Sequence, residues 1–212
     1  MKNALLLTLG FDEKFCYRAI LRHGISEGDK IVLVTAKIVN RVKKAYDWVK
    51  TFVNTSYSNV EMKLIELNVE DTIGSIKKVL EILEELEGYH IVINLSGGMR
   101  ILSFIVLLSL LFKEIRNAVI EIELEDFSGI VRIPVILLTL PSIKEKLGEE
   151  KIKILKTIRD GKNNVKSIAE YLNKDQSTIR RHISSLKKLG LIEYEKRKPL
   201  KVKPSKLLDL IL

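Results

Sequence analysis

The sequence predicts an α/β domain, built on a mostly parallel sheet with a closing β-hairpin, followed by a C-terminal winged helix-turn-helix domain. Three observations lead to this fold class. Short apolar runs rich in β-branched residues alternate with helical patterns over the first two thirds of the chain, as in parallel strands joined by crossover helices. Two further apolar runs flank a turn. The last segment is basic and shows three helical patterns and then two short strand patterns.

Each element of the first domain has its own signal. The third helix is expected to begin near Asp71 and Thr72, which can cap it, and apolar residues recur every three or four positions after it. Residues 101–112 are expected to form a helix that is apolar on all sides. Such a helix is buried either in the core or partly against another subunit. Strands are expected at residues 4–9, 31–36, 60–67 and 90–95, helices at 13–23 and 38–54, and a hairpin from 118–124 and 130–138.

Charge divides the 212 residues into two parts. Residues 1–148 carry 19 Lys and Arg against 19 Asp and Glu, whereas residues 149–212 carry 17 against 8, so the last segment holds the whole net charge of +9. A folded basic segment attracts a polyanion, usually nucleic acid, although a solvated basic surface without a partner is the alternative. We expect a ligand-binding and dimerisation domain at 1–141, a linker at 142–148 and a DNA-binding domain at 149–212.

Several classes of protein are disfavoured. One cysteine, Cys16, can form neither an intrachain disulfide nor a multi-cysteine metal site, which favours a reducing, cytoplasmic location and no metal. The longest uncharged apolar stretch has 12 residues, short of the roughly 20 that span a bilayer, and acidic residues follow the first apolar run where a signal peptide would be cleaved. The glycine signatures of dinucleotide oxidoreductases and P-loop nucleotide hydrolases are absent, and we expect no cofactor.

A ligand site is expected where two parallel strands end. Ligands of open parallel sheets bind at the carboxyl ends of the strands, where the strand order reverses. Glycines after the first and fourth strands let backbone N–H groups approach an anion at a helix N-terminus, although a tight turn can need glycine for geometry alone. Phe11 could stack on a base, and Arg100 offers a fork of donors. The expected ligand-binding residues are Thr8, Leu9, Gly10, Phe11, Asn94, Ser96, Gly97, Gly98, Met99 and Arg100.

The last segment predicts a DNA-binding module. Helices at residues 149–159, 165–172 and 176–189, with Asp175 capping the last, precede a hairpin with a basic tip, and this order is that of a winged helix. The helix after the turn would lie in the major groove, and a protein-interaction module is the alternative. The expected DNA-binding residues are Gln176, Ser177, Thr178, Arg180, Arg181, Ser184 and Lys187 on the helix, and Lys196, Arg197 and Lys198 on the wing.

These motifs resemble the CRISPR-associated Rossmann-fold (CARF) regulators with a C-terminal winged helix-turn-helix, as found in archaeal CRISPR loci. The resemblance rests on the residues after the first strand, on Asn94-Leu95-Ser96-Gly97-Gly98-Met99-Arg100 after the fourth, on the closing hairpin and on the appended basic module. It implies a Rossmann-like fold and a cytoplasmic homodimer that takes part in antiviral defense. Paired motifs in that dimer would bind a cyclic oligoadenylate, often cyclic tetra-adenylate, and its winged helices would bind double-stranded promoter DNA.

The sequence therefore leaves three functions open. The leading expectation is a ligand-responsive transcription regulator without catalytic residues. The second is a ring nuclease that slowly cleaves its cyclic ligand without metal, using Ser96, Arg100 and Thr8 to position it and to stabilise charge. The third is an adaptor that binds no ligand. The histidines, His23, His90 and His182, are expected to have structural roles because none is obviously placed as an acid-base catalyst.

Overall fold

The computed structural model describes residues 2–113, 115, 117–195 and 201–212. These residues form two compact units, Met1–Leu138 and Thr139–Leu212. The boundary falls inside helix α5, Ile136–Glu145, ahead of the linker expected at residues 142–148.

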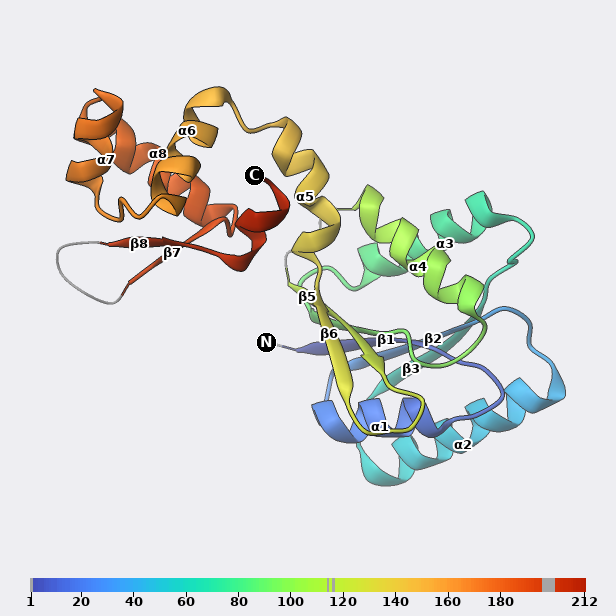
Figure 1. The fold of residues 1–212 in the computed structure, drawn as a ribbon. Coiled ribbons are helices and arrows are strands. Elements are labelled where there is room, and N and C mark those ends of the chain that lie inside the picture. Colours follow the sequence, from blue (N-terminus) through green and yellow to red (C-terminus); the bar gives the residue numbers. More distant parts are fainter. Residues whose placement is uncertain (1, 114, 116, 196–200) are drawn as a thin grey trace. The chain divides into compact units, whose positions relative to one another are not determined.

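A six-stranded sheet forms the centre of the first unit (Figure 1). The strand order is β3-β2-β1-β4-β5-β6, and only the β5–β6 pair is antiparallel. The predicted mostly parallel sheet with a closing hairpin is therefore confirmed. The strands are β1, Asn3–Thr8; β2, Lys30–Thr35; β3, Glu61–Glu66; β4, His90–Asn94; β5, Ala118–Glu123; and β6, Ile130–Pro134.

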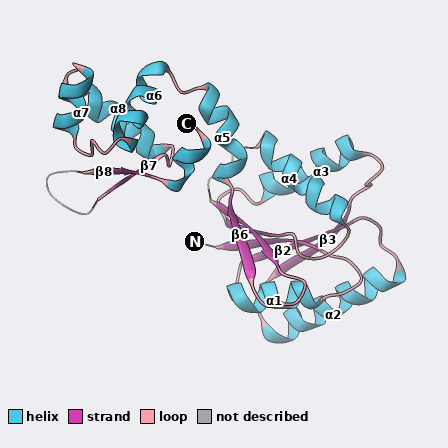
Figure 2. Ribbon diagram, viewed as in Figure 1, coloured by secondary structure: helices cyan, strands magenta, loops and turns pink. Residues whose placement is uncertain are grey.

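Two helices cover each face of this sheet (Figure 2). Helices α1, Lys14–His23, and α2, Asn40–Ser56, pack on one face, and α3, Thr72–Glu85, and α4, Arg100–Phe112, on the other. Strand residues alternate between the two cores because successive side chains point to opposite faces, so Leu5 and Leu7 join the α1–α2 core while Leu6 joins the α3–α4 core. As expected, Asp71 caps α3, its carboxylate accepting a hydrogen bond from Gly74 N at 2.9 Å.

The end of the hairpin differs from the prediction. The strand expected at residues 130–138 ends at Pro134, and helix α5 starts at Ile136. The bond from Leu138 N to the Val135 carbonyl, 2.9 Å, already belongs to a helical turn. A short apolar run such as Val135-Ile136-Leu137-Leu138 has no periodicity that distinguishes a buried strand from a helix, so the sequence pattern extends the strand too far.

Three helices and a hairpin form most of the second unit. Helices α6, Glu149–Arg159, α7, Val165–Leu172, and α8, Gln176–Lys188, are followed by β7, Ile192–Tyr194, and β8, Val202–Pro204, which pair antiparallel, and by a 3-10 turn, η1, Lys206–Leu210. Asn164 caps α7 by accepting from Ser167 N at 2.8 Å. The expected order of a winged helix-turn-helix is present, but the wing tip, with Lys196, Arg197 and Lys198, lies outside the described residues. Among the described residues, no helix combines the length and the apolar character that a membrane span requires.

Candidate ligand pocket and DNA-binding helix

A cavity of about 410 Å³ lies where three parallel strands end. Its walls come from the loop after β1, the loop after β4 and the segment after β2. Strands β1 and β4 are neighbours although two strands separate them in sequence, so this is the point at which the strand order reverses. The cavity is lined by Leu9, Gly10, Phe11, Asp12, Phe15, Thr35, Ala36, Lys37, Val39, Val42, Ser96, Gly97, Gly98, Met99 and Leu102.

The glycines of the two loops pack against each other. A Cβ on Gly10 would lie 2.8 Å from the Gly98 Cα, and a Cβ on Gly97 would lie 2.5 Å from the Thr8 carbonyl oxygen. Both distances are shorter than the contacts that Cβ atoms make in proteins. Gly98 also has a φ of 76°, which side chains rarely adopt. The glycines are therefore required where one backbone touches the other. This need for glycine by geometry alone is the alternative to a role in ligand binding that the sequence raises.

Seven of the ten expected ligand-binding residues line this cavity, and three do not. Thr8 and Asn94 are buried beneath it; the Thr8 hydroxyl donates to the Asn94 carbonyl at 3.4 Å, and the Asn94 side-chain oxygen accepts from Ser96 N at 3.1 Å. The Asn94 amide nitrogen is buried without a hydrogen-bond partner among the described residues. Arg100 is exposed at the first residue of α4, with no ion pair among those residues. The pocket therefore rests on polar groups that its ligand would not touch.

Ser96 is held in place from the next strand. Its hydroxyl oxygen accepts a hydrogen bond from Glu123 N at 2.8 Å, at the end of β5. The hydroxyl hydrogen stays available to a ligand because the oxygen here acts as the acceptor. The loop after β4 is thus anchored on both sides, through its glycines to the loop after β1 and through Ser96 to β5.

The segment after β2 forms a wall that sequence reasoning missed. It contributes Thr35, Ala36, Lys37 and Val39 to the cavity. It has no glycine and no motif, so the only available signal was the position of the second strand beside the first, which a parallel crossover favours. Backbone contacts fix it: Ile38 N donates to the Glu66 carboxylate at 2.7 Å.

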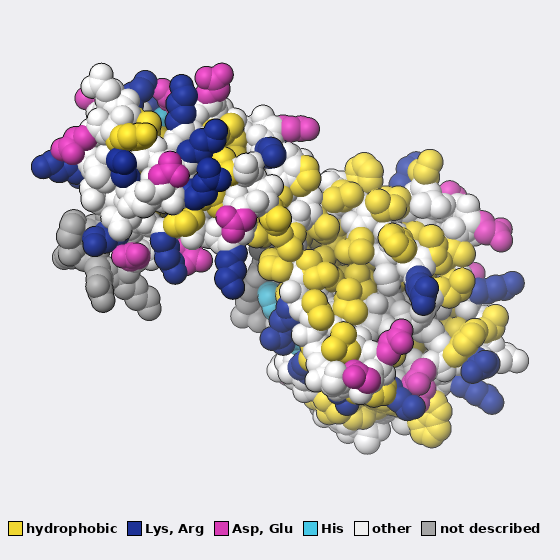
Figure 3. Space-filling model, viewed as in Figure 1, with side chains coloured by type: hydrophobic (Ala, Val, Ile, Leu, Met, Phe, Trp, Pro, Cys, Tyr) yellow, Lys and Arg dark blue, Asp and Glu magenta, His cyan; other side chains and the backbone are white. Residues whose placement is uncertain are grey.

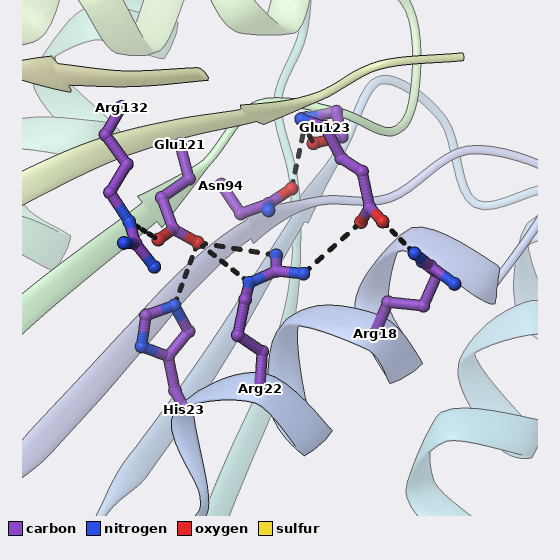
Figure 4. A network of polar contacts seen from close by, with 8 residues as sticks. Arg18, Arg22, His23, Asn94, Glu121, Glu123 and Arg132 are labelled. Atoms are coloured by element: carbon purple, nitrogen blue, oxygen red, sulfur yellow. Dashed lines mark hydrogen bonds and ion pairs between the residues drawn. The ribbon is translucent and has the colours of Figure 1, made fainter. Parts of the chain in front are cut away.

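Two buried carboxylates on β5 form hydrogen bonds and ion pairs with side chains of α1 and β6 (Figure 4). Glu121 accepts from His23 Nε2 at 2.8 Å and from Arg132 Nε at 2.8 Å, and Arg22 lies 3.4 Å away. Glu123 pairs with Arg18 and lies 3.5 Å from Arg22. Both carboxylates are almost fully buried, whereas the cations reach solvent to differing extents. This cluster ties α1 to β5, the strand whose backbone holds Ser96.

The pKa of Glu121 reflects two opposing effects. Burial acts to raise it, because a charge loses its hydration in the interior, but the hydrogen bonds from His23 and Arg132 and the charge of Arg22 outweigh that effect. The pKa of Glu121 is therefore below its ordinary value, and the carboxylate is ionised at neutral pH. The other two histidines also have polar partners: His90 Nδ1 lies 3.1 Å from Asn117 Oδ1, and His182 Nε2 lies 3.3 Å from Glu150.

Helix α8 has one buried face and one polar face. Ile179, Ile183 and Leu186 are buried. Thr178 is half-buried. Asp175 occupies the N-cap position as expected, but its side chain does not make the expected cap hydrogen bond. The Lys187 ammonium lies 3.9 Å from the centre of the Tyr194 ring. The remaining expected DNA-binding residues of the helix are exposed: Gln176, Ser177, Arg180, Arg181 and Ser184.

A parallel sheet with a cavity at its strand-order reversal, followed by a helix-turn-helix unit, defines a Rossmann-like domain joined to a DNA-binding domain. Residues 3–134 match the family described as "Csa3 CRISPR-associated Rossmann-like domain", and the chain belongs to this family. Residues 148–194 match the description "Bacterial regulatory protein, arsR family". The chain is thus a CRISPR-associated protein with a regulator-type helix-turn-helix domain.

Comparison with solved structures includes the crystal structure of protein VC1899 from Vibrio cholerae, at 12% sequence identity and a TM-score of 0.44. The match covers 95% of this chain and 61% of that protein, so the chain spans about three fifths of its length. None of the curated proteins compared matches the chain.

Proposed function

We propose that the chain is a CRISPR-associated transcription regulator. It binds double-stranded DNA through α8 and the hairpin, and it binds a cyclic oligoadenylate, cyclic tetra-adenylate in particular, at the seam of a homodimer. The single observation that carries this proposal is the combination, in one chain, of a cavity at the strand-order reversal with a helix-turn-helix whose second helix exposes a polar and basic face.

The DNA-binding part rests on the exposed side of α8. Ser177, Arg180, Arg181 and Ser184 recur at the three- and four-residue spacing that aligns side chains on a helix, and these residue types contact phosphates and base edges. The excess charge of the chain lies in the same unit. A surface of this kind attracts DNA over a distance and then contacts it in the groove.

The ligand-binding part rests on the cavity. Its volume lies in the range of small-molecule sites, about 300–1,000 Å³. Backbone N–H groups of the glycine loop and the N-terminus of α4 favour an anionic group such as a phosphate. An adaptor without a ligand would leave this cavity without a use.

The homodimer is supported by helix α4. Four large apolar side chains, at positions 104, 108, 111 and 112, are exposed along one side of it, and Phe104 and Phe112 expose 62% and 72% of their surface. Figure 3 shows hydrophobic side chains gathered on the face of the first unit that carries α4. An exposed apolar patch of this kind marks an interaction surface. Because α4 begins at the glycine loop, a two-fold axis beside it would bring two cavities together, and an even-membered ring could then make each contact twice.

The ring-nuclease alternative depends on two hydroxyl groups that already make structural hydrogen bonds. Thr8 is buried and donates to a carbonyl, and the Ser96 oxygen accepts from a backbone N–H. Among the described residues that line the cavity there is no histidine, and the one carboxylate, Asp12, lies 3.5 Å from Lys14. These contacts favour a pocket that holds its ligand intact over a pocket that cleaves it.

The test combines ligand, DNA and product measurements on the full chain. Duplexes selected from a random library by the protein are used to measure affinity with and without cyclic tetra-adenylate, with linear tetra-adenylate as the control ligand. We expect one ring to bind per two chains, a change in DNA affinity with the ring only, and most of the ring intact after an hour with chelator present. Absence of ring binding would refute the sensor, and rapid cleavage abolished by Ser96→Ala would support the nuclease.

A further inference from the structure

The third wall of the cavity has a chemistry of its own. Lys37 and Val39, on the segment between β2 and α2, are exposed and line the cavity together with Phe11 from the opposite loop. The Lys37 ammonium has no hydrogen bond or ion pair with any described residue. A cation in this position is free to bind an anionic group that enters the cavity.

The Phe11 ring has a guanidinium group beside it. The guanidinium carbon of Arg41, in the first turn of α2, lies 4.4 Å from the centre of the Phe11 ring. Phe11 lines the cavity but Arg41 does not, so the guanidinium packs against the ring from outside the cavity. Phe11 is 58% exposed, and Arg41 has no carboxylate partner among the described residues. The ring therefore has Arg41 as a neighbour and still exposes more than half of its surface beside the cavity.

We propose that Phe11, positioned by Arg41, is a stacking platform for one purine base of the ligand, and that Lys37 binds the phosphate beside that base. Phe11, on the loop after β1, then selects a ligand that carries a base, while Lys37, on the β2–α2 segment, and the N–H groups of the glycine loop after β4 bind its phosphates. This proposal rests on the proposed function in one respect, that the ligand is a nucleotide. Aromatic rings and guanidinium planes stack on bases, and a purine offers the larger face.

The experiment measures binding of cyclic tetra-adenylate to the full chain by calorimetry. Phe11→Ala should weaken binding about 5- to 150-fold for each stacked base, and Phe11→Trp should restore it. Arg41→Lys keeps the charge but loses the planar group, so it should weaken binding less than Phe11→Ala does. Lys37→Ala should lower the dependence of affinity on salt. Lys43→Ala, an exposed change elsewhere on α2, is the matched control and should leave binding unchanged.

A second measurement tests the Phe11 platform independently of whether the natural ligand is cyclic tetra-adenylate. The wild-type chain should bind adenosine 5′-monophosphate more tightly than ribose 5-phosphate, and Phe11→Ala should lose this preference. If cyclic tetra-adenylate does not bind but the preference for adenosine 5′-monophosphate is present, the proposed function fails and the platform stands. If cyclic tetra-adenylate binds the Phe11→Ala variant as tightly as the wild-type chain, the platform is refuted. The platform is also refuted if the wild-type chain neither binds cyclic tetra-adenylate nor prefers adenosine 5′-monophosphate.

Discussion

Replacing Glu121 by glutamine removes the negative charge on β5 that Arg22, Arg132 and the His23 imidazole contact. The carboxylate is fully buried, and it accepts from His23 and Arg132 at 2.8 Å each while Arg22 lies 3.4 Å away. Glutamine has nearly the same shape, but its amide offers one acceptor oxygen in place of two and turns an N–H donor toward a cation. The variant therefore tests the charge of this residue without opening a cavity.

The expected loss of stability follows from the exposure of each partner. Arg132 is 60% exposed, so its pair contributes under about 1 kcal/mol. The half-buried His23 and Arg22 make hydrogen bonds to a charged group, which contribute about 1.5–3 kcal/mol where they are well formed. One of these contacts survives in part with glutamine, and we expect a net loss of about 3 kcal/mol in the free energy that keeps α1 closed on the sheet, a factor of about 150 in the opening equilibrium.

Cys16 provides the assay, because it is the one cysteine of the chain and lies on α1. Its thiol is buried, and burial, reinforced by the nearby Glu13 and Asp12, raises its pKa to about 12. A thiol reagent at pH 8 can label it only when α1 opens, and when reclosing is fast the labelling rate follows the open population. Glu121→Gln should be labelled about 150 times faster than the wild-type chain.

The matched control is Glu61→Gln. Glu61 lies on β3, is about half exposed and forms ion pairs with Lys30 and Lys63, so its loss should cost less than about 1 kcal/mol, under a fivefold change in labelling rate. An effect of Glu121→Gln no larger than that of this control would refute the reasoning.

Acid provides a second check on Glu121. Because the folded pKa of Glu121 is depressed, its contribution is present above the pKa of an unfolded glutamate, about 4.3, and is lost as the pH falls through the lower folded value. The wild-type chain should therefore lose stability in this acidic range more steeply than Glu121→Gln, as measured by circular dichroism during an acid titration. Equal slopes for the two proteins would contradict the assignment.

Three further predictions concern other parts of the chain. Gly97→Ala should destabilise the first unit by about 1–3 kcal/mol in the thiol assay, because its Cβ would lie 2.5 Å from a backbone carbonyl, whereas Gly129→Ala, with 3.6 Å of room, should not. Arg180→Ala should weaken DNA binding and reduce its salt slope by about one unit if the side chain contacts a phosphate, whereas Lys156→Ala on α6 should change neither in anisotropy titrations. Asn164→Ala removes the cap of α7 and should cost about 1 kcal/mol in thermal unfolding.

Local patterns were sufficient for most of the fold. The alternating apolar runs mark buried strands because a two-sided sheet buries every residue of its central strands, and the cap at Asp71 marks a helix start. They failed at residues 135–138, where a four-residue apolar run fits a strand and a helix equally well. The apolar helix at residues 101–112 left two readings open, and the structure shows that one side of it is exposed.

The candidate site was predictable where glycine marked it and hidden elsewhere. The loops at Gly10 and Gly97 stand out in the sequence because glycine there is a backbone requirement. The wall at Lys37 uses ordinary residues, and its place depends on the strand order alone. The carboxylates of Glu121 and Glu123 alternate with isoleucines as on any half-exposed strand, and their partners on α1 lie about a hundred positions away, so pairing over this distance leaves no local signal.

The contact between the two glycine loops also separates positions of this chain that neighbouring backbone constrains from positions that it leaves unconstrained. Gly10, Gly97 and Gly98 are fixed by neighbouring backbone, so a mutation at any of them must be accompanied by a shift of the opposite loop. Phe11, Lys37 and Met99 project from the same scaffold with exposed side chains that no backbone constrains. Single substitutions of these rim residues would therefore change the lining of the cavity while the sheet beneath stays as it is.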